Sequence, residues 1–160
     1  MSVEIDTFRL EHAEHFAELN RKWLESYDLM EPAEEAQLAD PQGYFLNRGG
    51  QIFVALHNGQ VIGTCAVMPH GIEELELAKL TVALEFRGQG IARLLVERCI
   101  AYAREQGARR VMLVSNSRLQ PALRLYESLG FQYCPVPEAK RYEVADVSMV
   151  LRLDPGDPAA

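Results

Sequence analysis

A short glycine loop is the part of this sequence best suited to chemistry. Arg87-Gly88-Gln89-Gly90 follows an apolar, β-rich run and precedes an apolar stripe at helical spacing. Glycines let a backbone turn tightly and present its N–H groups, and a following helix adds unpaired amides and a positive dipole end. Arg87 adds a formal charge. The loop therefore predicts a phosphate or pyrophosphate site, although a plain strand-to-helix turn with a surface arginine explains the loop alone equally well.

Two familiar phosphate loops do not fit these residues. A Walker loop ends in Gly-Lys-Ser/Thr, which is absent here, and a dinucleotide fingerprint needs a third glycine where Arg93 stands. A phosphate site at this loop must therefore be of another kind.

The loop needs flanking elements to position it. Residues 74–83 read as a long strand, the stripe from Ile91 to Ala103 reads as a helix, and residues 110–114 read as a buried strand. This strand-helix-strand unit predicts parallel pairing. Upstream, Asn58-Gly59 joins two β-rich runs, 51–57 and 60–68, and predicts a hairpin with a type I′ turn.

The remaining elements follow from periodicity and from proline and glycine signals. They are a strand through Val3, Ile5 and Phe8, an amphipathic helix over 11–27, a short acidic helix at 33–38, a helix from Pro121 to Gly130, and strands near 131–134 and 145–153. A chain of 160 residues fits one domain, which we place at 1–153, and we expect 154–160 to form a disordered tail.

Composition narrows the class of partner. Hydrophobic residues make up 48% and charged residues 24%, which are ordinary globular values, and the net charge is −7. An acidic chain attracts neither phosphate backbones nor anionic lipid, so we expect no nucleic-acid or membrane partner.

The three cysteines match no zinc pattern, and His12 and His15 lack a third ligand, so we expect no metal. Without a signal-peptide or membrane-spanning pattern, we expect a cytoplasmic protein.

Two sequence blocks resemble the GNAT superfamily of N-acetyltransferases. The first runs from Glu76 through Arg87-Gly88-Gln89-Gly90-Ile91-Ala92 and fits that family's Arg/Gln-x-x-Gly-x-Gly/Ala signature. The second, Ala122-Leu123-Arg124-Leu125-Tyr126-Glu127-Ser128-Leu129-Gly130-Phe131, matches its later helix and strand. Both occur in the right order, and the resemblance covers nearly the whole chain. It implies an α/β (α+β) fold with a mixed, mostly antiparallel sheet and helices on both faces.

The resemblance also implies a co-substrate and its binding residues. Acetyl-CoA would lie in a wedge between the strand ending at Val82 and the strand ending at Ser115. Backbone groups at Leu80, Thr81 and Val82 would bind its acyl and pantetheine part, with one N–H polarising the thioester carbonyl. Its pyrophosphate would bind the loop and the start of the helix, formed by Arg87, Gly88, Gln89, Gly90, Ile91 and Ala92.

Direct transfer needs an uncharged amine, so a base or a water path must remove a proton. Glu76 is the candidate base, because it lies an even number of residues before Leu80 and Val82 and shares their strand face unless a bulge intervenes. A solvated or salt-bridged carboxylate is the alternative, and Glu73 and Glu74 are rivals.

Tyr126 resembles the family tyrosine that protonates the departing CoA thiolate. On spacing alone it is a core tyrosine of an amphipathic helix. The usual asparagine seven residues earlier is replaced by Leu119, and Asn116 resembles a variant form that would bond the pantetheine amides.

The sequence therefore predicts an N-acetyltransferase that moves an acetyl group from acetyl-CoA to an amine of a small molecule or amino acid by direct ternary-complex transfer. The sequence is compatible with either a monomer or a homodimer. The alternatives are a non-catalytic acyl-CoA sensor or assembly module and a different phosphate binder built on the same turn.

Overall fold

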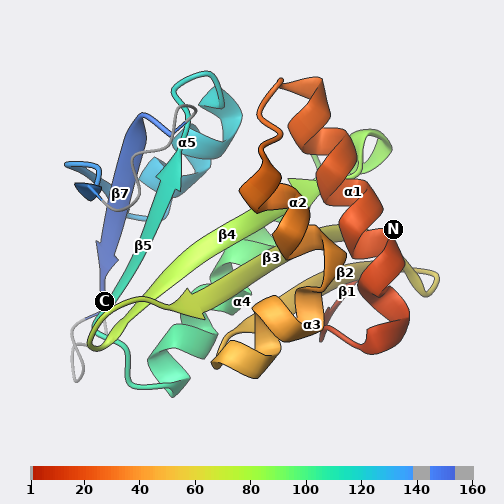
Figure 1. Ribbon diagram of the computed structural model, residues 1–160, viewed down its shortest axis with the longest axis horizontal. Helices are drawn as coiled ribbons and strands as arrows, with labels where there is room; N and C mark the ends of the chain where they lie inside the picture. The colour runs from red at the N-terminus through yellow and green to blue at the C-terminus, as the bar shows by residue number, and fades with distance from the viewer. Residues whose placement is uncertain (1, 139–144, 154–160) are drawn as a thin grey trace. The chain divides into compact units, whose positions relative to one another are not determined.

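A computed structural model of the protein describes residues 2–138 and 145–153. Seven strands form one sheet in the order β1-β2-β3-β4-β5-β7-β6. The β4/β5 pair is parallel, whereas β1/β2, β2/β3, β5/β7 and β6/β7 are antiparallel. The predicted mixed, mostly antiparallel sheet is thus confirmed (Figure 1). The strands are β1 (Glu4–Thr7), β2 (Gln51–His57), β3 (Gln60–Pro69), β4 (Glu74–Val82), β5 (Arg110–Ser115), β6 (Gln132–Cys134) and β7 (Val147–Arg152).

The predicted helices are present, and the structure adds the short helix α3 and several short turns that were not predicted. The α-helices are α1 (Ala13–Ser26), α2 (Pro32–Ala39), α3 (Pro41–Tyr44), α4 (Ile91–Glu105) and α5 (Gln120–Ser128). Three 3-10 turns, η1 (Leu10–His12), η2 (Leu46–Arg48) and η3 (Leu84–Phe86), complete the described part. The expected tail over 154–160 lies outside the described residues.

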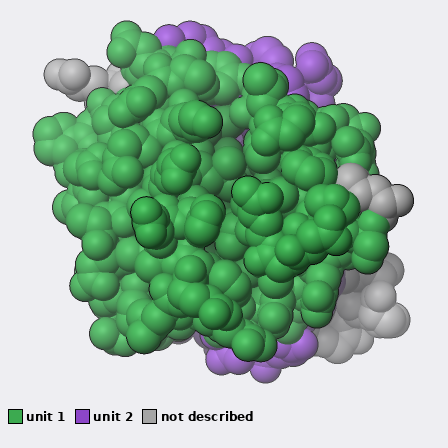
Figure 2. All heavy atoms as spheres, turned by 90° about the vertical axis from the view of Figure 1, so that its right-hand side faces the viewer, with its two compact units in different colours: residues 1–69, 77–100 green, residues 70–76, 101–160 purple. Residues whose placement is uncertain are grey.

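The chain divides into two compact units, coloured separately in Figure 2. Unit 1 comprises Met1–Pro69 and Leu77–Ile100, and unit 2 comprises His70–Glu76 and Ala101–Ala160. The division passes through β4 and α4. Unit 1 therefore holds the end of β4, the glycine loop and the start of α4.

Unit 1 is built around the β2–β3 hairpin. Asn58 and Gly59 have φ angles of 52° and 78°, which are the two left-handed residues of the predicted type I′ turn. Successive residues of β3 face opposite sides: a Cβ at Gly63 would meet Leu95 of α4, whereas the Thr64 hydroxyl bonds Asn20 of α1. Helices α1 and α2 accordingly lie on one face of β3 and the start of α4 on the other (Figure 1).

Unit 2 contains the parallel ladder that joins the start of β4 to β5, in which Glu76 pairs with Met112. The β5 strand also pairs along its length with β7, from Arg110↔Arg152 to Ser115↔Val147. Helix α5 packs its buried face, Leu123 and Tyr126, into this unit. No helix within the described residues is long and apolar enough to cross a membrane.

Candidate functional site

The glycine loop lies between β4 and α4, as predicted. Gly88 and Gly90 have φ angles of 78° and 81°, a region that residues with a side chain rarely adopt. A Cβ built at either position would meet nothing within 4 Å, so packing does not exclude a side chain there. Among the contacts that the protein makes with itself, none requires glycine at these two positions, and the requirement comes from the left-handed backbone conformation. The space beside them is therefore open to whatever the loop binds.

Arg87 adds a positive charge to the loop and also fixes its position by a hydrogen bond. Its Nε donates a hydrogen bond of 3.0 Å to the carbonyl oxygen of Val82, the last residue of β4. The exposed Arg87 side chain thus ties the loop back to the strand end. Helix α4 begins at Ile91 with no acidic residue in its first turn. No carboxylate therefore opposes the positive dipole end at the start of the helix, which favours binding of an anion there.

The strand before the loop is irregular at Lys79, which has a φ of 57° within β4. Burial alternates up to Leu77 and then breaks, since Thr81 and Val82 are both buried. The prediction for Glu76 assumed a strand without an irregularity between Glu76 and Leu80, and the strand has one at Lys79. Alternation no longer argues that Glu76 shares a face with Leu80 and Val82, and its assignment as the base stays a prediction that rests on the family resemblance.

Thr81 adds an unexplained polar atom to this strand. Among the residues that the structure describes, its Oγ1 is the buried side-chain oxygen without a hydrogen-bond partner. Such a group costs free energy unless a water or ligand satisfies it. The orphan hydroxyl lies on the strand whose backbone is predicted to bind the acyl and pantetheine part.

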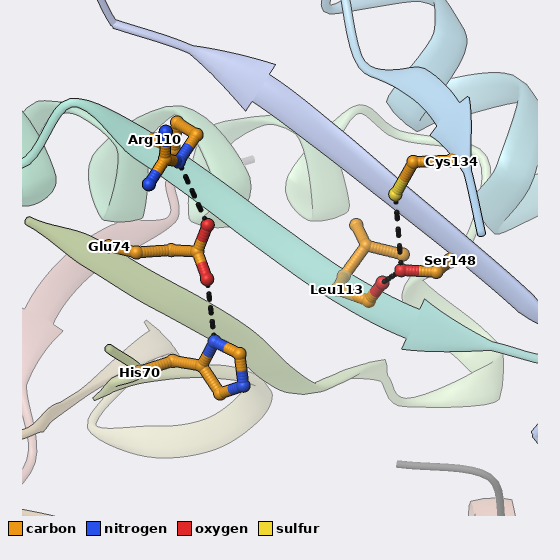
Figure 3. A network of polar contacts seen from close by, with 6 residues as sticks. All are labelled: His70, Glu74, Arg110, Leu113, Cys134 and Ser148. Atoms are coloured by element: carbon orange, nitrogen blue, oxygen red, sulfur yellow. Dashed lines mark hydrogen bonds and ion pairs between the residues drawn. The ribbon is translucent and has the colours of Figure 1, made fainter. Parts of the chain in front are cut away.

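The rivals of Glu76 are engaged in ion pairs. The Glu74 carboxylate accepts a 3.0 Å hydrogen bond from Arg110 Nε and lies 2.6 Å from His70 Nδ1 (Figure 3). Glu73 pairs with Arg109 at 2.9 Å. Both carboxylates link the start of β4 to residues around the start of β5. These contacts give Glu73 and Glu74 a structural role. Glu76 is half-buried in the next position of the same strand face as Glu74.

Tyr126 and Asn116 both lie in unit 2. Tyr126 is buried on α5, and its ring centroid is 5.6 Å from that of Phe131. Asn116 follows β5, and its Oδ1 accepts hydrogen bonds from the backbone N and Nε of Arg118. That oxygen therefore shapes the turn that leads to α5. Leu119 is buried at the start of α5, where the family's usual asparagine is missing.

The predicted residues thus fall into two groups. Leu80, Thr81, Val82 and Arg87 to Ala92 lie together in unit 1, and Glu76, Asn116 and Tyr126 lie in unit 2. Cys65 and Cys99 are fully buried, and burial raises the pKa of the Cys99 thiol, with Cys65 beside it. Within the described part of the chain, no group of three His, Cys, Asp or Glu residues could hold a metal ion.

Comparison with known proteins identifies the class. The sequence profile described as "Acetyltransferase (GNAT) family" matches residues 11–131. A GNAT acetyltransferase structure from Staphylococcus aureus covers 96% of the chain and all of its own, with a TM-score of 0.87 and 19% identity. A putative acetyltransferase from Salmonella typhimurium, solved with its cofactor acetyl-CoA, has a TM-score of 0.76 and 22% identity, covering 96% of this chain and 95% of its own. At these identities the structures show the fold alone.

The chain belongs to the acetyltransferase (GNAT) family. Its curated relatives include rat N-acetyltransferase family 8 member 2, which is 36% identical over 115 residues, 69% of this chain and 51% of that protein. Mouse N-acetyltransferase 8 is 41% identical over 96 residues, 57% of this chain and 42% of that protein. The chain thus spans about half the length of the curated relatives it matches.

Proposed function

We propose that this chain is an N-acetyltransferase that moves an acetyl group from acetyl-CoA to an amine of a small molecule or amino acid. The observation that carries the proposal is the glycine loop, whose two left-handed residues lead from the end of β4 into α4. Family membership and relatives named N-acetyltransferase support it. A cytoplasmic location stays a prediction.

The residues of unit 1 fit acetyl-CoA on two observations. The space beside Gly88 and Gly90 is open, so backbone N–H groups there can approach a pyrophosphate closely. The Thr81 hydroxyl is buried without a partner on the strand that would bind the pantetheine amides. When bound, acetyl-CoA supplies an acetyl thioester that an amine can attack.

Each proposed residue has one task in a direct transfer. Arg87 to Ala92 bind the pyrophosphate, and backbone groups from Leu80 to Val82 hold the pantetheine and polarise the thioester carbonyl. Glu76 takes a proton from the amine, directly or through water. A carbon–nitrogen bond would then form and the carbon–sulfur bond would break, the attacking nitrogen would lose a second proton to water, and the Tyr126 hydroxyl would give a proton to the departing thiolate. Because Cys65 and Cys99 are buried core thiols, neither is suited to an acetyl-cysteine intermediate.

The acidic character of the segment after α1 supports an amine acceptor, but three of its carboxylates are engaged within the protein. Glu35 is ion-paired with Arg21, and Glu34 is ion-paired with Lys79. Asp40 accepts a hydrogen bond from the Gly43 amide as the N-cap of α3. Recognition of an amine would then fall to other carboxylates nearby, such as Glu25 at the end of α1 and Asp28 just after it.

A thermal shift followed by a thiol-release screen tests the proposal. Acetyl-CoA at about 100 times its Kd adds about 2.7 kcal/mol, or roughly 5 to 10 °C in melting temperature. A screen over amines, polyamines, amino acids and antibiotics should then release CoA thiol with at least one acceptor. Binding without thiol release for any acceptor would favour the acyl-CoA sensor, and binding of a nucleotide in place of acetyl-CoA would favour the other phosphate binder.

A further inference from the structure

A buried chain of hydrogen bonds crosses unit 1 from α1 to β4. Asn20, which is 2% exposed, donates from Nδ2 to the Phe16 carbonyl at 2.9 Å and to Thr64 Oγ1 at 3.0 Å. The Thr64 hydroxyl in turn donates to the carbonyl oxygen of Lys79 at 2.7 Å. The chain therefore ends on the irregular residue of β4.

Lys79 is held by its side chain as well as by its carbonyl. Its ammonium group pairs with the Glu34 carboxylate of α2, and its side chain is only 7% exposed. A non-glycine residue in left-handed backbone is strained and persists only where the surroundings impose it. Here the surroundings hold Lys79 from two directions, through Thr64 and through Glu34.

Fixing the Lys79 carbonyl also fixes the next N–H group. The peptide unit that joins Lys79 to Leu80 is planar and trans, so its C=O and its N–H point in opposite directions. A carbonyl turned toward Thr64 therefore turns the Leu80 N–H away from Thr64. Leu80 begins the stretch whose backbone is proposed to bind the acetyl group.

From this geometry we infer that Thr64, backed by Asn20, and Lys79, backed by Glu34, are positioning residues that aim the Leu80 N–H at the thioester carbonyl of acetyl-CoA. The inference rests on the proposed function. It adds residues from α1, α2 and β3 that neither the glycine signature nor the strand pattern identifies. A misaimed donor should weaken stabilisation of the charge that develops on the carbonyl oxygen, while the pyrophosphate loop still binds CoA.

The decisive variant is Thr64→Val, which keeps the side-chain shape and removes the hydroxyl. We expect kcat to fall about 10-fold, because removing such a donor altogether costs about 100- to 1000-fold and a misaimed one less. The Kd for free CoA, which has no acetyl carbonyl, should stay within about 2-fold of the parent value. Thr64→Ser restores a hydroxyl and should recover most of the lost kcat.

The ion pair provides a second variant with a matched control. Glu34→Gln should lower kcat, by less than Thr64→Val does, because the Lys79 carbonyl keeps its bond to Thr64. Glu35→Gln breaks the exposed pair between α2 and Arg21 of α1, at the residue next to Glu34, and should leave kcat unchanged. If Thr64→Val does not fold, the comparison of Glu34→Gln with Glu35→Gln still tests the inference.

The outcomes separate this inference from the proposed function. A parent protein that neither binds acetyl-CoA nor releases thiol refutes the proposed function. A working parent whose Thr64→Val and Glu34→Gln variants keep full kcat refutes the positioning role. Equal losses of kcat and of CoA affinity would refute it too, because they would show that these residues only support the fold.

Discussion

The two units use different parts of the polypeptide for their proposed tasks. In unit 1 the task falls to backbone groups of the β4 end, the loop and α4, and the residues that matter are glycines with φ angles of 78° and 81°. In unit 2 it falls to side chains, the Glu76 carboxylate and the Tyr126 hydroxyl. A backbone site depends on conformation, whereas a side-chain site depends on which group stands at one position and what surrounds it.

This difference explains why the two predictions have different strength. A glycine loop before a helix predicts anion binding from physical principles alone. A tyrosine on an apolar helix face is equally a core residue, and Tyr126 is indeed buried against Phe131. Its catalytic role comes from the family resemblance, so substitutions must decide it.

The largest effect is expected from the backbone site. Gly90→Val should abolish acetyl-CoA binding, because the side chain would fill the space beside the loop and disfavour its left-handed conformation. Gly107 is a matched control, since its φ of 77° and the empty space around it are similar, but it follows the end of α4. Gly107→Val should cost similar stability and leave acetyl-CoA binding intact. Equal binding by the two variants in a thermal-shift titration would contradict the assignment of the loop.

The next effect tests the side-chain site at Tyr126. Tyr126→Phe keeps the ring that packs on Phe131 and removes the proposed acid, so kcat should fall about 10²-fold while acetyl-CoA affinity is kept. Tyr133→Phe is the control, because Tyr133 is exposed and its hydroxyl bonds Glu127. If steady-state kinetics show an unchanged kcat for Tyr126→Phe, Tyr126 has only a packing role.

Glu76→Gln tests the proposed base. The loss in kcat/KM should lie near 10²-fold at neutral pH and shrink as pH rises, because more of the amine is then already neutral. Glu74→Gln should instead lower the melting temperature, since it weakens contacts to His70 and Arg110 (Figure 3), and should keep most of the activity. If activity is lost only in Glu74→Gln, the base is misassigned by two residues; if in neither, deprotonation runs through water.

Local signals in the sequence predicted most of the fold. Asn58-Gly59 determines its hairpin turn, and Pro121 and Gly130 delimit the helix at α5 within two residues. The short turns η1, η2 and η3 were not predicted, since three residues carry too little periodicity to read.

The site was predicted less completely. Nothing in Ala78-Lys79-Leu80 indicates a left-handed residue, because neither glycine nor asparagine stands there. The contacts that hold Lys79 join residues distant in sequence, with Asn20 and Thr64 separated by 44 positions. Such contacts arise only when the helices pack on the sheet. Strand alternation therefore could not fix the face of Glu76 relative to Leu80.

The smallest expected effect concerns the turn that carries Asn116. Asp146 accepts hydrogen bonds from the backbone N of Ser117 at 2.8 Å and from its Oγ at 2.7 Å. These bonds favour the charged carboxylate and hold the pKa of Asp146 below its usual value of 3.8. A lowered pKa stabilises the fold above that usual value, and this contribution is lost as pH falls through the lower pKa of the folded protein.

Asp146→Asn should therefore lower the melting temperature at pH 7 by only about 2 °C, because the pair is exposed and solvent screens it. The difference between parent and variant should begin to fade as the pH falls below about 4, where the unfolded parent chain takes up a proton at this carboxylate, and vanish below the lower pKa of the folded protein. Melting curves between pH 3 and 7 check this, and a difference that grows on acidification would contradict the role given to Asp146.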